Sequence, residues 1–262
     1  MSAAATSSPG ARVPPTIMGA IAVAWALAVG AEISGRGSAL HHDTLIEGKL
    51  PYGLALVLFL LAWQAMVAAM MVPSSLPLVR LFAAAAAGQP RPRAAMAAFL
   101  GGYALVWTSF GWLAFVGDTM VHATVDRTPW LQQHAWLIAG GTLAIAGAFQ
   151  FSALKDRCLD VCRHPGAFLL RHYERGLPAA FSLGRRHGLF CLGCCWALML
   201  LMFAAGVANL WWMAGLTALM VYEKSGARGR RAVPVAGLAL LACAALVLAH
   251  PHWLPPILGG TH

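Results

Sequence analysis

Residues 187–202 carry a stripe of side chains that are typical metal ligands. The first four stand at positions i, i+4, i+7 and i+8, and two more continue the pattern, so one face of an α-helix would carry them all. They are His187, Cys191, Cys194, Cys195, Met199 and Met202. Thiolate and thioether ligands are soft and suit Cu(I), and imidazole accepts copper or zinc. The stripe therefore predicts a soft-metal site, with copper as the first choice of metal and zinc as the second.

A second pair of cysteines precedes this stripe. Cys158 and Cys162 are four residues apart and share a helical face, and residues 151–163 have the pattern of an amphipathic helix. We expect this helix to continue the fourth membrane span beyond the bilayer surface until Pro165 ends it. The loop that follows can fold back to the same surface, which favours one metal site built from both cysteine groups. The alternative is that each cysteine simply packs in an apolar interior, as we expect for Cys243.

Polar side chains within apolar segments are costly in a bilayer and mark candidate functional positions. We assign supporting roles at the metal site to Gln150, Lys155, Asn209 and Glu223. Two of them have simpler explanations. Asn209 could satisfy backbone groups at a helix turn, and Glu223 could form an interfacial ion pair with Lys224.

A group of methionines, Met66, Met70 and Met71, lies just before the sequence PSS at 73–75. Packing against lipid or core side chains would explain it. It becomes a further source of thioether ligands only if its helical face turns toward the cysteine stripe.

The elements that position these residues are membrane helices by composition. The 262-residue chain is 60% hydrophobic and 10% charged, whereas soluble domains carry about 25% charged residues. Apolar runs near the ~20 residues that cross a bilayer lie at 13–34, 54–72, 94–116, 135–154 and 232–249. The charge-free stretch 188–222 is too long for one span, and we expect two short helices that meet near residues 206–209. These features predict an all-α, polytopic transmembrane helical bundle of about seven spans.

The positive charges predict the orientation of this bundle. With the N-terminus in the cytoplasm, 15 of the 18 Lys and Arg residues fall in inner segments, as the positive-inside rule requires. Topology and anionic lipids then explain the net charge of +9, and we exclude nucleic acid as a partner. We expect a multi-pass protein of the cell inner (cytoplasmic) membrane, with its cysteines at the cytoplasmic side, where thiols stay reduced.

Composition divides the chain into three parts. Residues 1–12 are expected to be a disordered N-terminal tail, 13–250 a single transmembrane helical domain, and 251–262 a C-terminal tail. The sequence has no nucleotide-binding loop, no Ser/His/Asp order and no HExxH motif, so nothing in it supports a hydrolase.

Several blocks of the sequence resemble one bacterial family. QFSALKDRCLDVCRHP (150–165) is followed by GRRHGLFCLGCCWALMLLMF (184–203), ANLWW and the EK pair at 223–224, and it is preceded by MVAAMMVPSSLPL (66–78) and GYALVW (102–107). Together they resemble predicted metal-binding integral membrane proteins (domain of unknown function 2182), some of which are labelled copper chaperones. The similarity covers residues 55–225. The site that it implies consists of Met70, Met71, Gln150, Lys155, Cys158, Cys162, His187, Cys191, Cys194, Cys195, Asn209 and Glu223.

The leading interpretation is an integral membrane protein that binds a soft metal, copper first, for metal trafficking or cofactor delivery. Its expected partners are the lipid bilayer and a metal-donor or metal-acceptor protein or membrane complex. One alternative is an enzyme, either a membrane-embedded thiol–quinone oxidoreductase or a metalloenzyme, and another is a structural subunit of a membrane complex. Cysteines on the reducing side favour the non-enzymatic interpretation.

Overall fold

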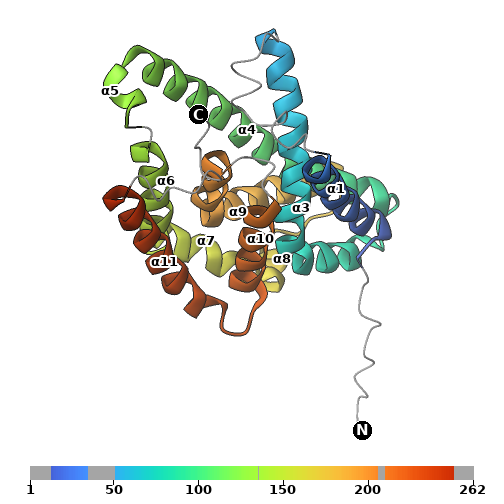
Figure 1. Ribbon diagram of the computed structural model, residues 1–262. Helices are drawn as coiled ribbons and strands as arrows, with labels where there is room; N and C mark the ends of the chain where they lie inside the picture. The colour runs from blue at the N-terminus through green and yellow to red at the C-terminus, as the bar shows by residue number, and fades with distance from the viewer. Residues whose placement is uncertain (1–12, 35–50, 135, 206–209, 251–262) are drawn as a thin grey trace.

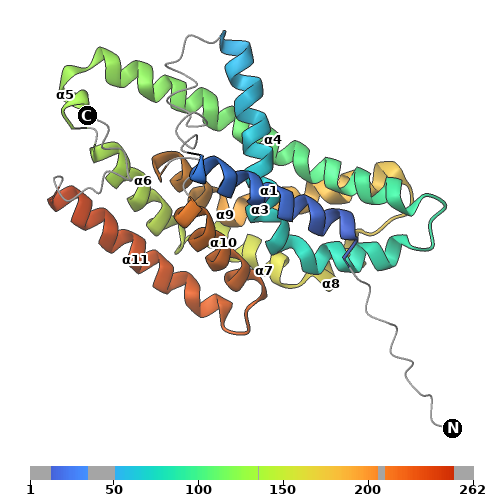
Figure 2. The same ribbon diagram turned by 45° about the vertical axis from the view of Figure 1, so that its right-hand side comes forward.

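The computed structural model describes residues 13–34, 51–134, 136–205 and 210–250, and all the regular secondary structure in these ranges is helical. In chain order the helices are α1 (Pro15–Ile33), α3 (Tyr52–Ala86), α4 (Pro92–Arg127), α5 (Pro129–Gln132), α6 (Trp136–Phe149), α7 (Ala153–Arg163), α8 (Pro165–His172), α9 (Leu177–Ala205), α10 (Leu210–Ser225) and α11 (Gly229–Ala249). Helix α9 runs through the middle of the bundle and packs against α4, α6, α7 and α10 (Figures 1 and 2). The predicted all-α fold is confirmed.

Four of the helices, α1, α3, α4 and α11, are long and apolar enough to cross a membrane, and the bent pair α6–α7 would make a fifth span. Helices α3 and α4 have 35 and 36 residues and extend well beyond the apolar runs that predicted them. Helix α9 ends at Ala205 and α10 begins at Leu210. The turn expected at 206–209 and both predicted tails lie outside the described residues. The seven spans and the cytoplasmic N-terminus therefore remain predictions.

The fourth predicted span does not continue into the amphipathic helix as one rod, and this part of our prediction was wrong. Helix α6 ends at Phe149 and α7 begins at Ala153, with a bend of 62° between them. Ser152 restarts the helix because its hydroxyl accepts a hydrogen bond from the backbone N–H of Lys155 at 3.1 Å, as helix N-caps do. Pro165 lies in the first turn of α8, where its fixed φ suits a helix start.

Pro73 interrupts the hydrogen bonding inside α3 and thereby joins this helix to α1. Proline has no backbone N–H, so the carbonyl of Ala69, one turn earlier, loses its helical donor. The indole N–H of Trp25 in α1 donates to that carbonyl at 3.0 Å. Because no water replaces a lost backbone bond in apolar surroundings, this donor stabilises the break and holds α1 against the methionine-rich part of α3.

Helices α4 and α9 approach each other to backbone contact. A Cβ atom added to Gly102 would overlap the carbonyl oxygen of Phe181, and one added to Gly184 would overlap the carbonyl oxygen of Phe99. Glycine at a crossing allows two helices to pack this closely, as small residues do in membrane helix pairs. The close crossing brings Tyr103, the neighbour of Gly102, against the cysteine stripe of α9.

Candidate metal centre

The stripe predicted on residues 187–202 forms one buried face of α9. All six of its side chains are buried, with exposed fractions between 0 and 5%. Its five sulfur-bearing members share one apolar core with Met66, Met70 and Met71 of α3. The thiol of Cys195 lies 3.6 Å from the thioether sulfur of Met71. The methionine face of α3 therefore turns toward the cysteine stripe, which was the condition for including it among the candidate ligands.

The two cysteine groups meet at the contact between α7 and α9. The side chains of Cys162 and Cys194 lie close together, and Cys162 packs against the core that contains the stripe. The sulfur of Cys158 lies against the backbone of Gly193, where an added Cβ would be only 2.6 Å from it. Gly193 thus leaves the space that lets α7 reach the stripe. The structure thus brings the two cysteine groups together, the arrangement on which the predicted single metal site depends.

Hydrogen bonds connect His187 to the sulfur cluster through side chains of two other helices. The imidazole Nε2 lies 3.1 Å from the Ser75 hydroxyl, which donates to the Tyr103 hydroxyl at 3.4 Å. The Tyr103 hydroxyl lies 3.1 Å from Cys191 Sγ. The imidazole also stacks on the ring of Tyr103, with centroids 5.5 Å apart. His187 therefore contacts the cluster through Ser75 and Tyr103, two residues that our sequence analysis did not single out.

The adjacent residues Glu223 and Lys224 do not form the simple ion pair that was one reading of the sequence. The Glu223 carboxylate accepts a hydrogen bond from the ammonium of Lys155 at 2.8 Å, and both side chains are buried. The ammonium of Lys224 instead donates to the Ser74 hydroxyl at 2.9 Å and to Cys191 Sγ at 3.2 Å. Lys224 is thus a third residue at the cluster, after Ser75 and Tyr103, to which the sequence analysis gave no role at the metal site.

The remaining predicted supporting residues differ in how the structure places them. Gln150 is buried between α6 and α7, and neither polar atom of its amide has a hydrogen-bond partner among the described residues. Its side chain packs against Gly237 of α11. Asn209 lies outside the described residues.

The cysteines are close together, but their sulfur atoms are not directed toward a common point where a metal ion could bind. The thiols of Cys194 and Cys195 donate to the backbone carbonyl of Cys191 at 3.1 and 2.8 Å. Among the described residues, no three His, Cys, Asp or Glu side chains are arranged as a ready metal site. A soft metal ion would have to displace the thiol protons, as metal ions do at cysteine sites, and the sulfurs would have to turn from the carbonyl toward the ion.

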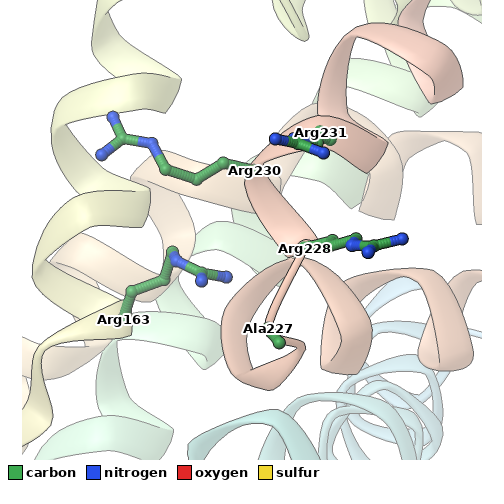
Figure 3. A pocket seen from close by; sticks show the side chains of 5 residues that line it. All are labelled: Arg163, Ala227, Arg228, Arg230 and Arg231. Atoms are coloured by element: carbon green, nitrogen blue, oxygen red, sulfur yellow. The ribbon is translucent and has the colours of Figure 1, made fainter.

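An open pocket at the turn between α10 and α11 is separate from this cluster (Figure 3). Its volume is about 310 Å³, and it is lined by Arg163, Ala227, Arg228, Arg230 and Arg231. Arg163 donates to the backbone carbonyls of Glu223 and Gly226, and Arg230 pairs with Asp156 and Asp160. A pocket lined by cations does not suit a metal cation, so it is not the metal centre.

The fold and the cluster define a helical protein whose buried centre gathers soft sulfur ligands, and four of its described helices are long and apolar enough to cross a membrane. The chain belongs to a family described as copper chaperone: the family model, PpoB2, matches residues 60–247. No curated protein and no solved structure matches the chain. The matched residues include the α7 and α9 cysteines together with Met70, Met71 and Lys224, and membership supports a copper-related role.

Proposed function

We propose that this protein is a multi-pass protein of the inner membrane that binds Cu(I) at the α7–α9 cysteine cluster and passes it on, in metal trafficking or cofactor delivery. The observation that carries the proposal is the convergence of five cysteines and Met71 in one buried core. Cu(I) prefers such soft ligands, and the apolar surroundings exclude water. His187 would complete or gate the site through its contacts with Ser75 and Tyr103.

The arrangement of sulfur atoms suggests how the ion would move. Two or three thiolates from Cys158, Cys162, Cys191, Cys194 and Cys195 would hold it. Met71, and beyond it Met199 and Met202 deeper along the stripe, would offer weaker thioether ligands. Exchange among soft donors replaces each bond with a similar one, so no step needs a bare ion in an apolar interior. The partner that gives or takes the copper would be a second protein or a membrane complex.

Copper content tests the proposal directly. Protein purified in detergent and loaded with Cu(I) should retain about one copper ion, or a small multiple, per chain, as measured by elemental analysis. The variant Cys191→Ser/Cys194→Ser should lose it, because two of the central thiolates are gone. Cys243→Ser is the matched control, since Cys243 is an exposed thiol on α11.

Three results would each count against the proposal: a wild-type protein that retains no copper, equal retention in all three proteins, or loss in Cys243→Ser alone. Zinc retained in place of copper, with the same dependence on Cys191 and Cys194, would keep the site and change the metal.

The proposed orientation has its own test. A reporter inserted at Ala227, in the exposed turn between α10 and α11, should report the cytoplasm, because the surrounding arginines favour that side. A reporter attached after His262 should report the opposite side. If both report the same side, α11 does not cross the membrane and the proposed seven-span topology fails.

A further inference from the structure

The buried charges at the cluster do not balance. Among the described residues, the buried side chains that carry a fixed charge are Lys155, Glu223 and Lys224. Lys155 and Glu223 pair with each other at 2.8 Å and cancel. Lys224 is 6% exposed, and its hydrogen-bond partners are a hydroxyl and a sulfur rather than a carboxylate. Among the buried side chains that the structure describes, one positive charge is therefore left over.

A buried ammonium without a counter-ion is strongly disfavoured, because burial removes its hydration and nothing of opposite charge replaces it. A residue that served only for packing would be better as methionine, which has similar length and no charge. The position of Lys224 is informative, because its Nζ lies 3.2 Å from Cys191 Sγ, inside the sulfur cluster. The cysteines of the cluster can supply the missing negative charge next to Lys224, because a thiol that loses its proton becomes a thiolate.

We propose that Lys224 is the counter-charge of an anionic copper(I)–thiolate complex anchored on Cys191. Two thiols that bind one Cu(I) release two protons to solvent, so the charge of the complex is −1. With Lys224 beside it, the buried charge falls from +1 without copper to zero with copper. This inference rests on the proposed copper function and adds the charge of the bound complex and the residue that stabilises it.

The contacts of Cys191 identify it as the anchoring sulfur. Its Sγ contacts the Lys224 ammonium at 3.2 Å and the Tyr103 hydroxyl at 3.1 Å. Ser74 fixes the lysine from the other side: its hydroxyl accepts from Lys224 and donates to the carbonyl of Met71 at 2.8 Å. The ammonium is thus held between α3 and α9 and is positioned before any metal arrives.

The test compares Lys224→Met with wild type by competition for Cu(I) against a soluble chelator, in detergent. Loss of a unit charge about 4 Å from the complex, at an effective dielectric constant of about 20, should weaken copper binding by roughly 100- to 1,000-fold. Lys224→Arg keeps the charge and should stay within about 10-fold of wild type. Arg231→Met removes one positive charge at an exposed position of α11 and should leave the affinity unchanged.

Thermal unfolding without copper separates this role from a structural one. Lys224→Met removes an unbalanced buried charge, so its unfolding midpoint should equal or exceed that of wild type while its copper affinity falls. Three results would overturn the inference: undiminished copper binding in Lys224→Met, a lower unfolding midpoint together with weaker binding, or an equal loss in Lys224→Arg. If wild type itself binds no Cu(I), the proposed function fails instead.

Discussion

Glu223→Gln should destabilise the protein by about 3–5 kcal/mol, because it leaves the buried ammonium of Lys155 without its carboxylate. The pair joins α7 to α10, and Lys155 has an exposed fraction of 0%, so water cannot replace the lost partner. Unfolding in detergent, followed by tryptophan fluorescence at increasing temperature, would measure the effect. Copper binding should weaken as well, since α7 carries one of the two cysteine groups.

The control for this prediction is the double variant Lys155→Met/Glu223→Gln. It removes both charges together, and replacing a buried ion pair by apolar or neutral groups is often close to neutral. The double variant should therefore unfold at a higher temperature than Glu223→Gln alone. A second control is Asp156→Asn, which breaks an exposed pair with Arg230 between α7 and α11 and should change the midpoint little. Equal midpoints for Glu223→Gln and wild type would show that the Lys155–Glu223 pair does not hold the helices together.

The residues of the α9 stripe could be predicted because helical spacing alone determines which side chains share a face. His187 and Cys191 are one turn apart, and nothing beyond local geometry is needed to place them together. The same holds for Cys158 and Cys162 on α7. The apolar runs predicted the helices for the same reason, since hydropathy reports local burial in a bilayer or core.

The residues that surround the stripe could not be predicted in this way, because their contacts join distant parts of the chain. Tyr103 is 88 residues from Cys191, and Ser75 is 112 residues from His187. Lys224 reaches Cys191 across 33 residues and Ser74 across 150. Their signals in the sequence were polarity next to apolar runs and a place in the blocks that resemble the bacterial family, and neither signal identifies a contact partner.

The bend between α6 and α7 was missed because hydropathy hardly changes across it. The apolar run at 135–154 extends through the break, so composition indicates one continuous span. The local signal was Ser152, a residue type preferred at helix N-caps, with Asp156 in the first turn of α7. The Ser152 cap starts a new helix at this point, although the apolar run continues. The new direction of α7 places its cysteines against α9.

Two adjacent glycines of α4 give the second large prediction. Gly102→Ala should destabilise the protein by about 3 kcal/mol, the upper end of overpacking effects, because the new methyl group would meet backbone atoms of α9 that cannot rotate away. These atoms are the carbonyl oxygen of Phe181 and, at 2.8 Å, the amide nitrogen of Arg185. Gly101→Ala is the matched control, since nothing lies within 4 Å of an added Cβ there.

Gly101→Ala should leave stability unchanged or raise it slightly, because alanine favours helix by about 1 kcal/mol over glycine. The comparison also reports on the metal centre. Any separation of α4 from α9 at Gly102 moves Tyr103 away from Cys191, so Gly102→Ala should retain less copper than Gly101→Ala when both are loaded alike. Indistinguishable unfolding midpoints in the two variants would mean that the α4–α9 crossing is looser than backbone contact. The support that α4 gives to the sulfur cluster would then need another explanation.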